Sequence, residues 1–258
     1  MNNGYVVGSI DVAELALAAF FLFFTLLVFW LRREDRREGY PLEHELTGRI
    51  ETVGGPLSTA VPKRFLLPFD RGVVSYPRPR GEGREPVQIA AKRIENFAGA
   101  PYVPTGNPLA DGVGPASYAE RARWPDQDAH GRARIVPLSG EATISVWSGG
   151  RDPRGMKVTA ADGLVAGTVR DMWIDRAEHQ VRYLEVETTG GKTVLAPMAM
   201  ASVSAKGVSI DAINAADYDG VPQLETAGEI TRYEEERIIG YFGGGYLYAN
   251  ANRQEPFL

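Results

Sequence analysis

The sequence predicts a fold in which one membrane-spanning helix near the N-terminus precedes a mostly β domain, which is built around a small barrel and ends in a helix. Three observations lead to this prediction. Residues 12–31 form an apolar run that holds one charged residue. Short runs rich in β-branched residues, separated by turn signals, follow between residues 156 and 210. A stretch with helix signals begins at residue 226.

The apolar run VAELALAAFFLFFTLLVFWL, residues 12–31, is long enough to cross a bilayer. At about 1.5 Å per residue it spans roughly 30 Å, the thickness of the hydrocarbon core. Asp11 can cap its first turn, and Glu14 stands three residues later, where a carboxylate favours a helix N-terminus. A functional acid within the membrane is the alternative interpretation of Glu14. A cleaved signal peptide is the alternative for the whole run, but its basic residues would precede the apolar core.

The positive charges beside this run predict its orientation. Residues 1–11 contain no lysine or arginine, whereas four arginines follow the run closely. Because positive residues resist translocation, we expect the N-terminus outside and the rest of the chain in the cytoplasm. The arginines can meet anionic lipid headgroups, and the acids between them can pair with basic residues of neighbouring subunits. The predicted membrane-interface residues are Trp30, Arg32, Arg33, Arg36, Arg37 and Tyr40.

Residues 32–108 are expected to form an extended strap rather than a domain with its own core. From Gly39 onward this segment is rich in proline and glycine, as in AVPKRFLLPFDRG and SYPRPRGEGREP, and it shows no sustained helical period. A floppy linker is the alternative, but a solvated linker gains nothing from the apolar cluster FLLPF at residues 65–69. We therefore expect the strap to lie on another protein surface.

Residues 109–258 are expected to form the folded β domain with its C-terminal helix. From residue 156 the runs MKVTA, LVAGTVRDMWI, VRYLEVE, TVLAP and VSI are separated by ADG, DRAEH, TGG and SAKG. Turn signals at intervals of about ten residues predict an antiparallel meander closed into a small barrel.

The stretch TAGEITRYEEERIIGYFGGG, residues 226–245, predicts one helix. Thr226 and Glu229 fit a capping box at its start, and the glycines at 243–245 are expected to end it. A nucleotide-binding loop is the alternative interpretation of these glycines. The apolar positions form an irregular stripe, so we expect the helix to pack on the barrel with one face exposed to solvent.

Composition and motifs argue against several classes of function. The chain has no cysteine, so it can form neither disulfides nor cysteine metal sites. Its formal net charge of −5, without a compact basic stripe, argues against a general nucleic-acid-binding protein. The sequence has no phosphate-binding glycine loop with its lysine, no GxSxG elbow and no HExxH pair, and its three histidines are far apart. We therefore expect neither catalytic residues nor a metal site in this chain.

Two groups of titratable residues remain as candidate sites. Both lie in predicted turns or at strand ends, where solvated charges are usual, and this is the alternative interpretation. In VRYLEVE, however, Arg182 falls on the strand face of Leu184 and Val186, which should point inward. A buried guanidinium needs a carboxylate nearby. The first group is Asp126, Asp128 and His130, and the second is Asp175, Arg176, Glu178, His179 and Arg182.

Five segments, taken together and in order, resemble the H subunit of the purple-bacterial photosynthetic reaction centre. They are LRREDRREGYPL after a single N-terminal span, PTGNPLADGVGPASYAERA at 104–122, DPRG at 152–155, DMWIDRAEHQVRYLEVE at 171–187 and EEERIIGYFGGGYLYA at 234–249. The likeness runs over almost the whole chain and is weakest from residue 46 to residue 96 and in the last few residues.

The resemblance implies a single-pass protein of the bacterial inner, intracytoplasmic photosynthetic membrane. Its N-terminus, residues 1–11, would lie in the periplasm, and its cytoplasmic domain would contain a PRC-type β-barrel placed over the L and M subunits. Such a subunit binds no pigment itself, stabilises and caps the L and M core, and contributes to proton transfer to the secondary quinone. It is an accessory subunit of a light-driven electron-transfer complex.

The resemblance also implies the cofactors and partners of the assembly. Bacteriochlorophyll, bacteriopheophytin, quinones and non-haem iron would be held by the L and M subunits. A cytochrome subunit, a light-harvesting antenna and membrane lipids are expected in the wider complex, and nucleic acid is not.

By the same resemblance, the proton-transfer residues are Asp128 and His130 near the entrance of the route, and Asp175, Glu178 and Arg182 closer to the quinone. A well-known member of this family has a second histidine two residues after the first, where this chain has Arg132. Arginine stays charged and cannot relay a proton, so the resemblance does not fix the entrance.

A membrane-anchored PRC-barrel adaptor or assembly module without a proton-relay role is the alternative function. In that case the acidic turns would be merely solvated. PRC-type barrels also occur in ribosome-maturation proteins, so the likeness of the barrel alone does not decide between the two.

Overall fold

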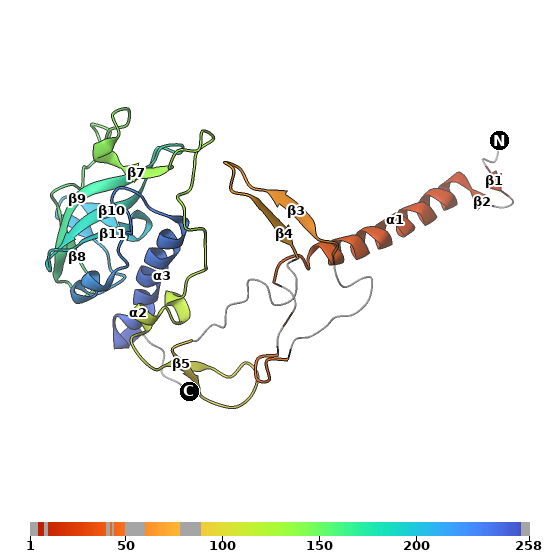
Figure 1. Ribbon diagram of the computed structural model, residues 1–258, viewed down its shortest axis with the longest axis horizontal. Coiled ribbons are helices and arrows are strands. Elements are labelled where there is room, and N and C mark those ends of the chain that lie inside the picture. The colour runs from red at the N-terminus through yellow and green to blue at the C-terminus, as the bar shows by residue number, and fades with distance from the viewer. Residues whose placement is uncertain are drawn as a thin grey trace. The chain divides into compact units, whose positions relative to one another are not determined.

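The structure is a computed structural model, in which the chain forms two compact units (Figure 1). The first unit consists of Met1–Val87 and Glu95–Pro101, and the second of Gln88–Ile94 and Tyr102–Leu258. The residues that the structure describes are 5–7, 10–39, 42, 44–49, 60–77 and 89–253.

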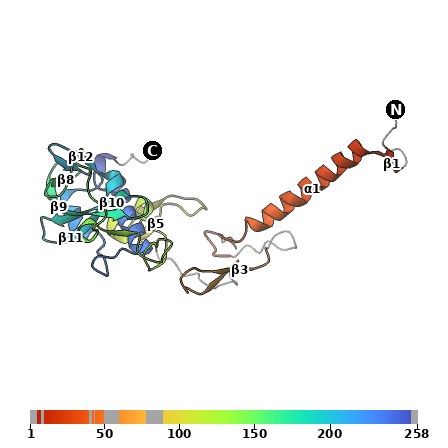
Figure 2. The ribbon, with the colours of Figure 1, turned by 90° about the horizontal axis from the view of Figure 1, so that it is seen from above.

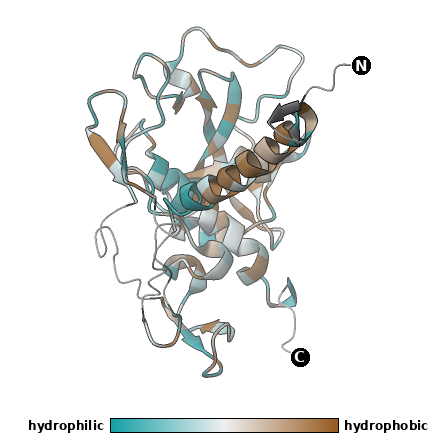
Figure 3. Cartoon of the chain, turned by 90° about the vertical axis from the view of Figure 1, so that its right-hand side faces the viewer, coloured by the Kyte–Doolittle hydropathy of each residue, from teal (hydrophilic) through white to brown (hydrophobic). Residues whose placement is uncertain are grey.

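The first unit contains the long helix α1, Val12–Glu34, after two short paired strands, β1 (Tyr5–Val7) and β2 (Ile10–Asp11). Figure 2 shows α1 as one uninterrupted helix, and Figure 3 shows it as hydrophobic over most of its length. None of its side chains is buried within the chain. Its length and apolar composition suit a membrane span, which agrees with the predicted anchor.

The start of α1 confirms the predicted cap. The Asp11 carboxylate accepts the backbone N–H of Glu14 at 2.8 Å, and the Glu14 carboxylate accepts the backbone N–H of Asp11 at 3.4 Å. This reciprocal capping box satisfies two N–H groups that the helix leaves free. It favours the capping interpretation of Glu14 over a functional acid within the membrane.

Short elements interrupt the predicted strap, residues 32–108. The part that the structure describes contains two antiparallel hairpins and a helical turn, and residues 50–59 and 78–88 lie outside that part. Apolar side chains on the first hairpin are exposed, Leu66 at 81% of its surface. Ordering of the strap by a partner surface stays a prediction. The elements are β3 (Lys63–Leu66), β4 (Val73–Tyr76), β5 (Ala91–Arg93), β6 (Tyr102–Pro104) and α2 (Pro108–Asp111).

The end of α1 is tied to the β3–β4 hairpin by charged side chains. Arg37 donates from Nη1 to the carbonyl oxygens of Val61 at 2.6 Å and Tyr76 at 3.0 Å. Glu34 accepts from Arg37 Nε at 2.8 Å and lies 2.7 Å from the ammonium group of Lys63. These two residues of the charged junction are therefore engaged within the chain itself.

Two aromatic residues were predicted as interfacial anchors beside α1. Trp30 is exposed, and the Lys63 ammonium group lies 5.9 Å from the centroid of its ring, within the range of a cation–π contact. Tyr40 lies outside the described residues.

The second unit is built on a seven-stranded sheet in the order β11–β10–β9–β8–β13–β12, with β7 paired to β9. The long strands β9 and β10 form its centre and pair antiparallel over most of their length. The strands are β7 (Ile135–Pro137), β8 (Lys157–Thr159), β9 (Val165–Asp175), β10 (Gln180–Thr188), β11 (Thr193–Pro197), β12 (Ser202–Ser204) and β13 (Gly207–Ser209).

The predicted meander is confirmed from β8 to β11, where each strand pairs antiparallel with the next. Two features differ from the prediction. β13 runs parallel to β8, and among the described residues β11 and β12 end the path of the sheet without pairing to each other. Strands of three residues, such as β12 and β13, supply few ladder hydrogen bonds. The sheet is thus open, and closure into a barrel is not confirmed.

The core lies between this sheet and the C-terminal helix α3, Arg232–Tyr248. Trp173, Tyr183 and Leu184 supply large, fully buried side chains from β9 and β10, and Phe242 supplies one from α3. Each such side chain contributes about 1.5–3 kcal/mol when it leaves water. Short 3₁₀ helices lie at Gly114–Ala116, Leu138–Gly140, Met198–Met200, Ala215–Gly220 and Ala251–Arg253.

The prediction of the ends of α3 was wrong. The helix starts after the N-cap Thr231, which forms a capping box with Glu234, rather than at Thr226 with Glu229. Glycines 243–245 lie inside the helix instead of ending it. A Cβ at Gly244 would lie 2.9 Å from Cα of Ala116, so the glycines allow the helix to pack closely against this segment.

Candidate functional site

The turn between β9 and β10 positions the second predicted group of charges. Asp175, the last residue of β9, accepts the backbone N–H groups of Ala177 at 2.8 Å and Glu178 at 3.1 Å. His179 has the left-handed backbone conformation, with φ of 52°, that returns the chain into β10. An aspartate that binds the backbone ahead of it is a usual way to fix a tight turn. The carboxylate of Asp175 is thereby held in place and is 4% exposed.

Arg134 joins the two predicted groups. Its Nη2 lies 2.6 Å from Oδ2 of Asp175 and 3.0 Å from Oε1 of Glu178, and its Nη1 lies 3.4 Å from Oδ2 of Asp126. The backbone explains this position, because β7 pairs with the end of β9 and places Ile135 opposite Asp175. Arg134 immediately precedes β7 and therefore reaches the turn. We call Arg134, Asp126, Asp175 and Glu178 the Arg134 cluster.

The Arg134 cluster sets the charge of Asp175. Burial acts to raise the pKa of the Asp175 carboxyl, but the hydrogen bond from Arg134 and those from the backbone N–H groups of Glu178 and Ala177 outweigh it. The pKa of Asp175 is therefore lowered. Glu178 is more than half exposed, so the cluster runs from solvent to a buried carboxylate within the reach of one guanidinium.

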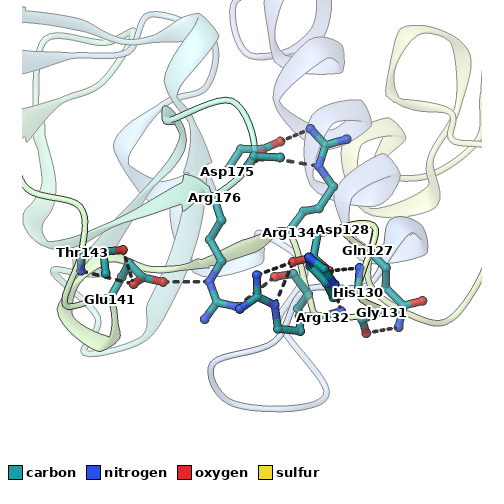
Figure 4. A network of polar contacts seen from close by, with 12 residues as sticks. Gln127, Asp128, His130, Gly131, Arg132, Arg134, Glu141, Thr143, Asp175 and Arg176 are labelled. Carbon is teal, nitrogen blue, oxygen red and sulfur yellow. Dashed lines mark hydrogen bonds and ion pairs between the residues drawn. The ribbon is translucent and has the colours of Figure 1, made fainter.

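The other two residues of the first predicted group, Asp128 and His130, lie in a tight turn shown in Figure 4. The Asp128 carboxylate accepts the backbone N–H groups of His130 at 2.8 Å and Arg132 at 3.0 Å, and the Arg132 guanidinium at 2.8 Å. The backbone hydrogen bond from Arg132 is the largest cause, and with the other donors it outweighs burial and lowers the pKa of Asp128 to about 2. The His130 side chain is exposed to solvent. Arg132 thus helps to hold Asp128 ionised.

A further ion pair flanks the Arg134 cluster. Arg176 Nε lies 2.9 Å from Oε2 of Glu141, as Figure 4 shows, and the backbone N–H of Arg176 donates to the carbonyl of Arg134 at 2.9 Å. Hydrogen bonds from Thr143 are the main cause of the lowered pKa of Glu141. This pair fixes the segment after β7 against the β9–β10 turn.

Arg182 was expected to point inward, on the strand face of Leu184 and Val186, and the structure differs from this prediction. Arg182 stands at an irregularity in the pairing of β9 and β10, between Val181 and Tyr183, and it is half-buried. Such a bulge breaks the two-residue alternation from which an inward side chain was expected. The carboxylate on which its charge acts is that of Glu235, which supplies the acid that a half-buried guanidinium requires. The partner of Asp175 and Glu178 is Arg134.

Sequence reasoning missed Arg134 and Glu235. Arg134 offered one signal, a charged residue directly before the short β-branched run of β7. Glu235 offered none, because it stands in a run of three glutamates whose exposure differs only in the folded protein. Within the described ranges, no group of three or more histidine, aspartate or glutamate side chains is arranged to hold a metal ion.

Comparison with known families gives two matches. Residues 4–140 match the family model described as photosynthetic reaction centre, H-chain N-terminal region, which covers more than half of the chain. Residues 148–216 match the PRC-barrel domain, and this range contains the strands from β8 to β13. Glu141 and Thr143 lie in the short segment between the two matched regions.

Proposed function

The chain belongs to the photosynthetic reaction centre H-chain family, and we propose that it caps the L and M subunits on the cytoplasmic side and supplies part of the proton route to the secondary quinone. Membership makes it a reaction centre subunit with L and M as partners, in a complex that carries pigments and quinones. In this proposal the chain has no active site of its own. A cytochrome subunit, an antenna and lipids complete the proposed surroundings.

The Arg134 cluster is the observation that supports the proton route. Reduction of a quinone to a quinol takes two electrons and two protons, and a quinone beneath a protein cap must receive those protons through side chains or water. Glu178 is exposed and Asp175 is buried, and both bind the same nitrogen of Arg134. The shared guanidinium thus links a carboxylate in contact with solvent to one inside the domain.

The basic residues after α1 support the proposed orientation. With the N-terminus in the periplasm, the second unit lies on the cytoplasmic side, where the secondary quinone takes up protons. In this proposal the arginines that follow α1 lie at the level of the anionic lipid headgroups, and one of them, Arg37, is also bound within the chain.

A second candidate function has its own support. The pKa values of Asp128 and Asp175 are lowered, so both stay ionised near neutral pH and act as fixed charges rather than as proton carriers. Fixed ion pairs suit an anchored PRC-barrel adaptor or assembly module in which the acidic turns are structural. Glu178 distinguishes the two functions, because it is the most exposed acid of the Arg134 cluster.

The test is Glu178→Gln in the assembled reaction centre. Glutamine keeps the shape and hydrogen-bonding capacity of Glu178 but cannot release a carboxyl proton. General acid–base groups contribute roughly 10²–10⁴-fold in rate. The loss in this variant should be no larger than that, because water or Asp175 can carry the proton past the missing carboxyl group. We expect slower proton-coupled transfer of the second electron to the secondary quinone, with unchanged primary charge separation. Flash spectroscopy with a pH-indicator dye measures both steps.

Glu187→Gln is the matched control, because Glu187 is an exposed acid on β10 that pairs loosely with Arg170 at 3.8 Å, outside the Arg134 cluster. It should leave both rates unchanged. A normal second-electron rate and normal proton uptake in Glu178→Gln would favour the adaptor. A Glu178→Gln variant that fails to assemble would make the role of this residue structural.

A further inference from the structure

Glu235 lies in the first turn of α3, where the helix meets the sheet. It follows Glu234, whose buried carboxylate completes the capping box, and precedes Glu236, which pairs with Arg121 at 2.8 Å near the surface. The three neighbouring glutamates therefore have three different environments. Glu235 is half-buried, and it contacts the sheet rather than the helix cap or solvent alone.

The contact of Glu235 is a hydrogen bond from Tyr183. The Tyr183 hydroxyl donates to Oε2 of Glu235 at 2.9 Å, and the Tyr183 side chain is 1% exposed. β10 holds this tyrosine between Trp173 of β9 and Pro197 of β11. Burial raises the pKa of the Tyr183 hydroxyl, so it remains a proton donor across the physiological range. One oxygen of Glu235 is thus fixed by a donor that does not titrate.

Three charged groups act on Glu235 besides Tyr183. Arg182 of β10 and Arg232 of α3 favour its ionised form, and Asp126 disfavours it. Asp126 also binds Arg134 at 3.4 Å. The charges therefore continue from Glu178 through Arg134 and Asp126 to Glu235, from the exposed turn to the face between α3 and β10.

The titration of Glu235 differs from that of the other perturbed acids. Burial is the largest cause and raises the pKa of Glu235, while Tyr183 and Arg182 oppose it without cancelling it. The lowered pKa values of Asp128 and Asp175 keep those acids ionised. An acid whose pKa is moved toward neutrality is better suited to gain and lose a proton there.

A pocket with space for water lies beside Tyr183, the hydrogen-bond partner of Glu235. Its volume is about 390 Å³, and Arg182, Tyr183, Met198 and Ile239 are among the residues that line it. Ile239 lies one helical turn after Glu235 on α3. Water in this pocket can reach the face of α3 from which Glu235 extends.

We propose that Glu235 holds a proton in the inner part of the route, receiving it from the Arg134 cluster and passing it on toward the quinone side. This inference rests on the proposed function. The step adds one proton to the Glu235 carboxylate and later releases it, and no electron moves. Tyr183 keeps its proton throughout and orients the carboxyl group.

The test uses Glu235→Gln in the assembled reaction centre, with light-induced proton uptake measured between about pH 5 and pH 9, a range that brackets a raised glutamate pKa. We expect one titrating component of the uptake to disappear, together with a carboxylic C=O band in the light-minus-dark infrared difference spectrum. Glu236→Gln is the matched control on the same helix turn. It should leave the uptake profile and the infrared band unchanged.

Tyr183→Phe supplies a second, directional test. The hydroxyl of Tyr183 stabilises the Glu235 carboxylate, so its loss should raise the pKa of Glu235 and move the titrating component to higher pH. A structural role for Glu235 predicts no such movement. If Glu235→Gln does not assemble, the presence or absence of this shift in Tyr183→Phe decides whether Glu235 carries a proton or has only a structural role.

The outcomes separate the inference from the function on which it rests. Slow second-electron transfer in Glu178→Gln, with an unchanged uptake profile in Glu235→Gln and no shift in Tyr183→Phe, overturns the inference alone. Normal behaviour of both glutamine variants overturns the proton route as well.

Discussion

Arg134 reaches three carboxylates from the segment before β7, and its contact with Asp175, at 2.6 Å, is the shortest of the three. The Asp175 carboxylate is 4% exposed, whereas that of Glu178 is 55% exposed. The attraction between opposite charges grows as water is removed, so Asp175 gains most from the guanidinium. At the scale of single residues, Arg134 is therefore the side chain that helps most to keep Asp175 ionised.

We expect Arg134→Gln to destabilise the β domain by about 1–3 kcal/mol at neutral pH, because the buried Asp175 carboxylate loses its charged hydrogen-bond partner. Arg134 lowers the folded-state pKa of Asp175 below the unfolded value of about 3.9. The stabilisation is present above that value and is lost as the pH falls through the folded-state pKa. The stability difference should therefore shrink in acid.

Denaturant unfolding followed by the fluorescence of the buried Trp173 measures this difference. Arg132→Gln is the control, because Arg132 is exposed and its partner Asp128 lies in a surface turn. It should change stability less than Arg134→Gln does. If the stability lost in Arg134→Gln stays constant from neutral to acid pH, the ion pair with Asp175 is not the source of the stabilisation.

At the scale of elements, α3 depends on its glycines for packing. A Cβ at Gly240 would lie 2.9 Å from the carbonyl oxygens of Ala116 and Ser117, tighter than normal contact. At Gly243 the nearest atom would be the carbonyl oxygen of Pro115, at an ordinary 3.5 Å. The neighbouring segment thus leaves no room for a Cβ at Gly240 but leaves room for one at Gly243, three residues later.

We expect Gly243→Ala to stabilise the domain by up to about 1 kcal/mol, since alanine forms helix more readily than glycine. Gly240→Ala should destabilise it by about 1–3 kcal/mol, because the added methyl group forces the helix away from its neighbouring segment. Thermal unfolding of the two variants, compared with that of the unmodified chain, shows whether each substitution raises or lowers the stability of the domain. Equal effects would mean that the close approach of α3 does not constrain the fold.

At the scale of the whole molecule, the arginine asymmetry around α1 predicts the topology. We expect protease added to the cytoplasmic face of sealed membrane vesicles to remove most of the mass of the chain, because the predicted topology puts the second unit on that face. Vesicles of the opposite sidedness should protect it. Digestion of the large domain only from the periplasmic face would contradict the orientation and, with it, the placement of the cap.

The sequence by itself determined the features that depend on local chemistry. The apolar run, the Asp11–Glu14 cap, the meander from β8 to β11 and the presence of a C-terminal helix each follow from residues close together in the chain. The ends of α3 were missed, because glycine usually ends a helix and is kept inside this one by contact with Ala116, more than 100 positions away.

Only the tertiary structure decided which charges meet. Asp175 and Glu178 were recognisable from the turn that contains them, but their partner Arg134 stands 41 and 44 positions earlier and reaches them through the pairing of β7 with β9. Glu235 and Tyr183 are 52 positions apart and meet where α3 packs on the sheet. Burial and pairing set the pKa of a carboxyl group, and both depend on contacts between distant segments. The sequence therefore indicated where the acids stand, and the fold determined which of them stay ionised and which one is moved toward taking up a proton.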